Sequence, residues 1–386
     1  MVITRDGQSR RYRIRIGAGG HGGYPLSYFD AISPAVDYRI EKMEHHRRAG
    51  YGAPLVALRV NRERDPLVLY YPEEAITRPL TAVLHPGPTQ GGVRELRIEL
   101  HCPLRNDDVV IEGRRRTLAA DFSVPWAALL ARTGELNKSG VADLLRSEPG
   151  RKPQLYLMEP YQPDKIPLIM VHGLRDTPLA WVNLSNEVWA DDEIRSRYQV
   201  WHFLYNTSAP ALYSGRMLSA QLRTLRPLLD PEGRDPAMQS TTLLAHSMGG
   251  LVSRRLITRP GDVFWQAAFT RPLEELRLSP EDRVTLKEAF FWKPAGHVQR
   301  VIYIAVPHRG SDYADNPIGR ISRWLVKPPS RFETFYERIS SANPGAFTPE
   351  YAALGRGELD SVDALSPRQP TLQILAGLPN SHPVQE

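Results

Sequence analysis

The chain has little cysteine and no long apolar run. Cys102 is the only cysteine among 386 residues, so no disulfide can form within the chain, and cysteine usage neither requires nor excludes an oxidising compartment. No stretch is long and apolar enough to predict a membrane span. Residues 1–16 contain arginines but no apolar segment of the kind found in secretory signals. We therefore expect either a cytoplasmic protein or a chain whose true N-terminus is missing, and the compartment stays unknown.

Long blocks of one charge are also missing. The 49 Lys and Arg residues and 43 Asp and Glu residues give a net charge of +6, but the basic residues are scattered among acids. We therefore expect no nucleic-acid partner, whereas contact with an anionic membrane surface stays open. Hydrophobic residues make up 41% of the chain and charged residues 24%, which predicts an ordinary globular protein of two or three domains.

Residues 1–150 predict a β-rich accessory module. Polar and apolar residues alternate at 12–16, 54–60 and 96–100, and Gly/Pro punctuation such as that at 86–88 separates such runs. This pattern favours a mostly antiparallel sheet with one packed face, followed by a helix near 125–131 and a breaker-rich linker. We find no catalytic constellation here and expect the module to pack on the rest of the chain or to bind a partner. His45 and His46 have no cysteine or carboxylate at metal-binding spacing, so we predict that they are surface residues.

Residues 151–386 predict an α/β domain. Apolar runs at 164–171, 198–205, 241–245 and 298–306 have the composition of parallel strands that are covered on both faces. Residues 214–229 carry apolar side chains at helical spacing. This order predicts a doubly wound, mostly parallel sheet. The segment 259–298 interrupts it and predicts either a cap over an apolar acyl-binding cleft or an insertion packed on the core, because it contains six aromatic residues: Phe264, Trp265, Phe269, Phe290, Phe291 and Trp292.

The most informative segment is the turn around Ser247. The strand predicted at 241–245 leads almost directly into Ser247, and an amphipathic helix is predicted over 251–257. Ala245, Gly249 and Gly250 are small enough to let a strand reverse into a helix, a turn that strains the residue at its tip and presents that side chain above the sheet. The helix N-terminus would favour negative charge beside Ser247. Ser247 is therefore a candidate nucleophile, the alternative being an ordinary turn with an incidental serine.

Residues 246–250 (His-Ser-Met-Gly-Gly) resemble the Gly-x-Ser-x-Gly nucleophile elbow of the α/β-hydrolase superfamily, in the form found in bacterial lipase-like serine esterases. Ala245 stands in place of the first glycine. Residues 172–174 (His-Gly-Leu) and 307–311 (Pro-His-Arg-Gly-Ser) follow predicted strands and extend the resemblance over about residues 154–378.

The resemblance implies roles for seven residues. Ser247 would attack the substrate, and the backbone N–H groups of Leu174 and Met248 would hold the developing oxyanion. The remaining four residues would line the site: His172, Gly173, His246 and His308. No metal and no organic cofactor are implied.

A complete triad is not evident in the sequence. A catalytic serine needs an imidazole base and an orienting acid, and in this family both follow two further strands. His308 comes too early in that order, and no convincing strand precedes any of the later acids, Asp312, Asp315, Asp360 and Asp363. His382 lies close to the end of the chain. We therefore expect the chain to be truncated, with its acid and base beyond Glu386.

Together these patterns predict a serine hydrolase that cleaves carboxylic esters, lipid-like or short-chain, through an acyl-enzyme on Ser247. The expected partner is an ester or lipid small molecule. Two alternatives stay open. One is an acyltransferase or amidase on the same scaffold, and the other is a non-catalytic hydrolase-like binding protein that keeps the elbow without a working triad.

Overall fold

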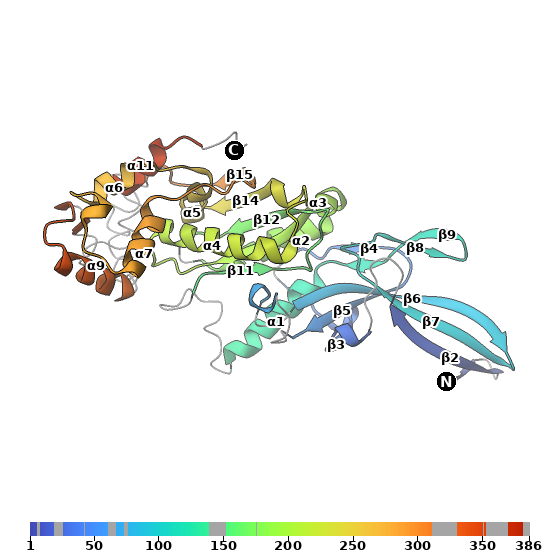
Figure 1. Cartoon of the computed structure of the whole chain (residues 1–386). Helices are drawn as coiled ribbons and strands as arrows, with labels where there is room; N and C mark the ends of the chain where they lie inside the picture. The colour runs from blue at the N-terminus through green and yellow to red at the C-terminus, as the bar shows by residue number, and fades with distance from the viewer. Residues whose placement is uncertain are drawn as a thin grey trace. The chain divides into compact units, whose positions relative to one another are not determined.

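The computed structural model describes residues 1–5, 8–18, 26–41, 43–60, 67–72, 76–138, 152–174, 176–310, 330–349, 351–352 and 370–380. Contacts divide the chain into two compact units, the first comprising Met1–Ala142, Leu157–Pro160 and Val182–Tyr198, and the second the remainder. The predicted fold class is confirmed, with a curled β-sheet in the first unit and a mostly parallel sheet with helices in the second (Figure 1). The domain boundary near residue 150 stays a prediction.

The first unit is built on a six-stranded sheet of order β1-β2-β7-β6-β5-β3. Its pairings are antiparallel apart from the parallel pair β2–β7, as the alternating pattern predicts. The strands are β1 (Val2–Arg5), β2 (Gln8–Ala18), β3 (Ala31–Pro34), β5 (Ala53–Arg59), β6 (Ile76–Gln90) and β7 (Val93–His101).

The expected break at residues 86–88 is wrong, because β6 continues through Pro86, Gly87 and Pro88. A register shift between Pro86 and Thr89 interrupts the ladder with β7 there. Prolines, which have no N–H to donate, are tolerated in a strand at such an irregularity.

Shorter elements complete this unit. The helix predicted near 125–131 is present as α1, and its Trp126 ring packs on Trp189 of α2 with centroids 4.4 Å apart. The other elements are η1 (Leu26–Tyr28), η2 (Ala35–Asp37), β4 (Arg47–Arg48), η3 (Val68–Tyr70), β8 (Asp108–Ile111), β9 (Arg114–Thr117), β10 (Ala120–Asp121), α1 (Val124–Lys138), α2 (Val182–Ala190) and α3 (Asp192–Arg197).

His45 is exposed and His46 half-buried, in agreement with the predicted surface position, but both have carboxylate partners that residue spacing did not indicate. His45 Nε2 lies 2.8 Å from Asp121 Oδ2, and His46 Nε2 lies 2.8 Å from Glu187 Oε1. Both carboxylates come from elements that are distant in the sequence, so residue spacing alone does not reveal them.

The second unit contains a five-stranded sheet of order β11-β13-β12-β14-β15, in which β14 pairs in parallel with both β12 and β15. All four predicted strands are present. Their centres, such as Ile169, Leu243 and Val301, are fully buried, which explains the apolar runs. The strands are β11 (Gln154–Leu157), β12 (Ile166–Val171), β13 (Tyr198–Leu204), β14 (Thr241–His246) and β15 (Val298–Ile304).

The connections make β12 and β14 a switch point in this sheet. The chain passes from β12 to its neighbour β13, then returns through α4 (Ala211–Leu229) to β14 on the other side of β12. The helix α5 (Met248–Ile257) follows β14 and packs closely on α4, where a Cβ added at Gly215 would lie 2.7 Å from the Val252 carbonyl oxygen. Both helices agree with the predicted segments. Two short 3-10 helices, η5 (Pro178–Trp181) and η6 (Met238–Ser240), precede α2 and β14.

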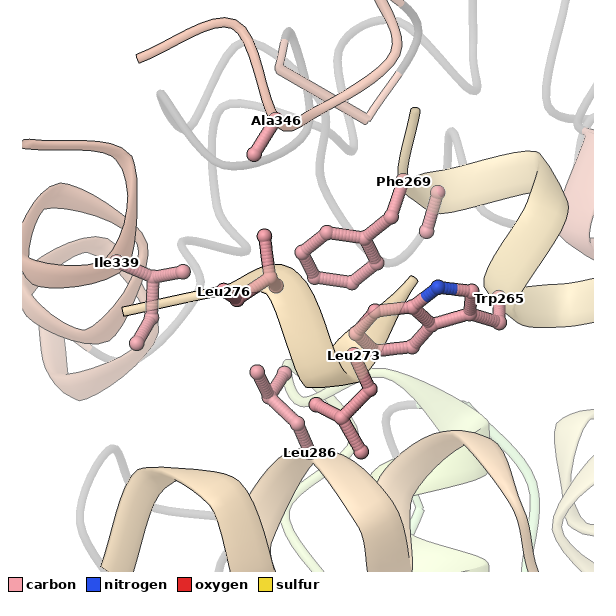
Figure 2. Packing of buried hydrophobic residues seen from close by; sticks show 8 residues of the cluster. Trp265, Phe269, Leu273, Leu276, Leu286, Ile339 and Ala346 are labelled. Carbon is pink, nitrogen blue, oxygen red and sulfur yellow. The ribbon is translucent and has the colours of Figure 1, made fainter. Parts of the chain in front are cut away.

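The aromatic segment 259–298 folds into short helices with a core of their own. Figure 2 shows Trp265 and Phe269 beside Leu273, and Leu276 between Phe269 and Ile339. The two aromatic rings are stacked with centroids 4.0 Å apart. The side chains of Phe264 and Trp292 are also buried. The packing alternative therefore describes these residues better than a cap over a cleft. The helices of this segment are α6 (Val263–Ala268), η7 (Leu273–Glu275) and α7 (Pro280–Phe290). Two helices further along the chain are α9 (Ser330–Ala342), which contributes Ile339 to the same core, and α11 (Pro370–Gly377).

None of the helices in the described part of the chain combines the length and the apolar character that crossing a membrane requires.

Candidate functional site

Ser247 lies at the tip of the turn between β14 and α5. Its backbone adopts φ 50° and ψ −124°, a conformation that is unfavourable for a residue with a side chain. Its N–H donates to the Ile304 carbonyl at 2.9 Å, and its carbonyl accepts from the Gly250 N–H at 2.9 Å, so the strained turn is held from both sides. The side chain is half-buried and therefore partly accessible to solvent.

Two glycines allow the end of β12 to approach this turn. A Cβ on Gly249, in the first turn of α5, would lie 2.6 Å from the His172 carbonyl oxygen. A Cβ on Gly173 would lie 3.1 Å from the Ser247 Cβ. Both values are shorter than ordinary carbon contacts of roughly 3.5–4.0 Å. The residues that follow β12 are therefore in direct contact with the Ser247 turn.

The topology explains why these two segments meet. The carboxyl ends of adjacent parallel strands lie at the same edge of a sheet, and ligands bind there where neighbouring strands connect in opposite directions. β12 and β14 are such a pair. The segments that follow them carry Gly173 and Ser247, so the candidate site occupies the position at which this class of sheet binds ligands.

Leu174 and Met248 are the predicted oxyanion donors. Leu174 follows directly on Gly173, and Met248 is the first residue of α5, where the first N–H groups have no partner within the helix. Neither amide donates a hydrogen bond to another residue in the described ranges. Their role as oxyanion donors stays a prediction.

His172 is buried beside Tyr205, next to the turn that carries Gly173. The side chain is fully buried, its Nδ1 donates to the Gly173 carbonyl at 3.0 Å, and its Nε2 accepts from the Tyr205 N–H at 3.4 Å. The Tyr205 hydroxyl donates to the His172 carbonyl at 2.6 Å, and the two rings stack. Burial lowers the pKa of His172 to about 4, so the imidazole is neutral at pH 7. It positions the turn that carries Gly173.

His246 and His308 lie at the same sheet edge in different surroundings. The His246 ring packs against Gly173, where an added Cβ would be 2.8 Å from its Nδ1. His308 follows β15, and its ring meets the edge of Tyr303 at a centroid distance of 4.5 Å.

The end of β15 contains a second strained residue. Ala305 has φ 49°, and it follows Ile304, which pairs with His246 at the end of β14. The residues that directly follow two neighbouring strands, Ser247 and Ala305, thus both have positive φ. Such strain persists only where the surrounding structure holds it, and it is commonly associated with functional sites.

Sequence patterns did not point to Tyr205 or Ala305 as part of this region. Tyr205 could have been found as the final aromatic residue of the strand predicted at 198–205. No sequence pattern predicts the positive φ of Ala305, because alanine rarely adopts this conformation. The candidate acids Asp312, Asp315, Asp360 and Asp363 and the candidate base His382 lie outside the described residues.

No protein-family model matches the chain, and no curated protein matches it. Among solved structures, the mature form of the Bacillus licheniformis lipase BlEst2 aligns with 51% of this chain and 68% of its own, at 20% identity and a TM-score of 0.28. The propeptide form of the same lipase aligns with 51% of this chain and 37% of its own, at 19% identity and a TM-score of 0.27. The likeness is partial.

Proposed function

We propose that the protein is a serine hydrolase that cleaves carboxylic esters, lipid-like or short-chain, with Ser247 as the nucleophile. The observation that carries the proposal is the backbone of Ser247, which is held at positive φ between a parallel strand and a helix with Gly173 in contact with its side chain. A strained strand-to-helix turn of this kind presents a hydroxyl to a ligand at the carboxyl edge of the sheet.

In the proposed reaction the Ser247 Oγ attacks the ester carbonyl carbon while a base takes its proton. The negative charge that forms on the carbonyl oxygen is held by the Leu174 and Met248 N–H groups, each contributing roughly 3–4 kcal/mol in the transition state. Collapse of the intermediate breaks the bond to the alcohol, which takes the proton from the base. Water then attacks the acyl-enzyme and releases the acid. We place the base and its orienting acid outside the described residues.

Two alternative functions use the same turn. An acyltransferase would form the same acyl-enzyme but release it to an alcohol or an amine, and an amidase would accept amides. A non-catalytic binding protein would keep the strained turn without a working base and acid.

Labelling with a fluorophosphonate probe tests the proposal. We expect the full chain to be labelled at Ser247, as identified by peptide mass, and the Ser247→Ala variant to remain unlabelled. Ser219→Ala is a matched control, because Ser219 is a half-buried serine on α4 whose hydroxyl bonds the Gly215 carbonyl. Equal labelling of wild type and Ser247→Ala would reject a catalytic role for this serine.

A panel of esters with increasing acyl length then separates esterase from lipase preference. Product analysis in the presence of an added alcohol separates hydrolysis from acyl transfer, because transfer yields a new ester in place of the free acid.

A further inference from the structure

Three side chains with metal-binding atoms meet on one face of the first unit's sheet. In the antiparallel pair β6–β7, His85 lies opposite Arg97 and Val83 lies opposite Glu99. Residues two apart on a strand share a face. His85 of β6 therefore lies on the same face as Glu99 and His101 of β7.

The ligand atoms are separated by the distances that one metal ion requires. Glu99 Oε2 is 3.0 Å from His85 Nε2 and 3.3 Å from His101 Nε2, and one ligand atom from each of the three residues lies within 4.8 Å of the others. Tetrahedral zinc with bonds of about 2.0–2.1 Å to nitrogen and oxygen places neighbouring ligand atoms about 3.3 Å apart.

The three buried side chains satisfy one another only in part. The side chains of Glu99 and His101 are only 7% and 4% exposed, and His85 is 17% exposed. Glu99 Oε2 lies within ion-pair distance of both imidazoles, but it is aligned poorly for a hydrogen bond to His85 Nε2 or His101 Nε2, and His101 Nδ1 has no hydrogen-bond partner among the described residues. Buried polar atoms without partners are costly, and each such atom in a native fold calls for an explanation such as an ion.

The second carboxylate oxygen of Glu99, Oε1, is paired with Arg97. Arg97 lies 3.0 Å from Glu99 Oε1, which leaves Oε2 facing the two imidazoles. An outer partner of this kind orients a ligand toward a metal.

We propose that His85, Glu99 and His101 bind one Zn²⁺ ion, with water completing the coordination. Two imidazoles and a carboxylate are a ligand set that zinc adopts, whereas Mg²⁺ and Ca²⁺ take oxygen ligands. The ion would join β6 to β7 beside Val83, which belongs to a buried cluster with Val109, Ile111 and Leu118. Because an unfolded chain does not preserve the site, zinc binding would stabilise this sheet.

A second group in the same unit provides the control. Glu44, His46 and Glu187 also bring ligand atoms within 4.8 Å of one another. There His46 Nε2 already has a partner in Glu187 Oε1 at 2.8 Å, and both carboxylates are exposed. We therefore expect His46→Ala to leave zinc binding unchanged.

The test is calorimetric titration of the full chain with ZnCl₂ after treatment with a chelator and its removal, followed by thermal melting with and without zinc. We expect one zinc ion per chain and a higher melting temperature with zinc. His85→Ala and Glu99→Gln should each weaken binding by at least about tenfold, by analogy with the 10–100-fold cost of losing outer-shell partners alone. Both variants should also lose the gain in melting temperature.

Three results would overturn the proposal: no stoichiometric binding by wild type, undiminished binding by both variants, or loss of binding in His46→Ala but not in His85→Ala. Circular dichroism establishes that each variant is folded. If the buried Glu99→Gln variant fails to fold, His85→Ala decides, because His85 is the most exposed of the three ligands.

Discussion

Replacing Gly249 with alanine tests whether the contact between α5 and the end of β12 assembles the site. The added methyl would lie 2.6 Å from the His172 carbonyl oxygen, and closer still to that of Val171. Both neighbours are backbone atoms at the end of a buried strand, so they cannot rotate away as a flexible side chain would. Restoring an ordinary contact of roughly 3.5 Å requires α5 to move by about 1 Å.

A displacement of about 1 Å in a catalytic site is expected to reduce the rate about 100-fold, equivalent to about 2.7 kcal/mol of transition-state stabilisation. The same overpacking should lower the free energy of unfolding by about 1–3 kcal/mol. We therefore expect Gly249→Ala to react with a fluorophosphonate probe about 100-fold more slowly than wild type when the rate is expressed per folded molecule. Urea unfolding gives the free energy of unfolding, from which the folded fraction in the labelling assay is calculated.

Gly296→Ala is the matched control, because an added Cβ there meets nothing within 4 Å. It should change neither the labelling rate nor the stability appreciably. A folded Gly249→Ala protein that labels as fast as wild type would refute the idea that this contact positions Ser247.

Three further outcomes follow from buried side chains. The Tyr205 hydroxyl holds the His172 carbonyl, so Tyr205→Phe should cost about 1–2 kcal/mol in urea unfolding and slow labelling; unchanged values for both would contradict this positioning role. Trp265→Ala should lower the free energy of unfolding by about 3–5 kcal/mol without altering acyl-chain preference, whereas a selective loss of long-chain activity would restore the cap interpretation. Burial lowers the pKa of His172 to about 4 and that of His297 to about 3, both from 6.5, so the unfolded chain binds more protons than the folded chain below about pH 6.5. The free energy of unfolding should therefore be highest above pH 6.5 and should fall as the pH is lowered toward 4. His297→Gln should lose less of this free energy on acidification than wild type. Equal losses in the two proteins between pH 7 and pH 4.5 would reject this assignment.

The second unit could be predicted well because local patterns and tertiary burial agree there. β12 and β14 are buried along almost their whole length, so each appears in the sequence as an apolar run, and the edge strand β15 is buried at Val298 and Val301. The strand-to-helix turn at Ser247 could be predicted because small residues on either side of Ser247 are a steric requirement of such a turn. The structure adds the reason for Gly249, which faces the end of β12.

Other features depend on residues that meet only after folding. The carboxylate that contacts His46 lies 141 residues further along the chain, and His85 meets Glu99 through the register of two strands. An alternating Glu-x-His pattern at residues 99–101 was visible in the sequence. It was indistinguishable from an ordinary strand until β6 supplied the third ligand.

The fate of the aromatic segment 259–298 could not be decided from composition. Aromatic residues are typical both of apolar clefts and of cores, and their spacing fits either. The structure favours the core alternative, because Ile339 of α9, far along the chain, belongs to the same buried cluster as Trp265.

The positive φ of Ala305 has a consequence for engineering heat tolerance. Glycine adopts this conformation without steric cost, so Ala305→Gly would relieve about 1 kcal/mol of strain, partly offset by the greater freedom of glycine in the unfolded chain. The equivalent change at Ser247 would remove the hydroxyl itself. Ala305 can therefore be replaced with glycine to raise thermal stability, whereas Ser247 must be kept.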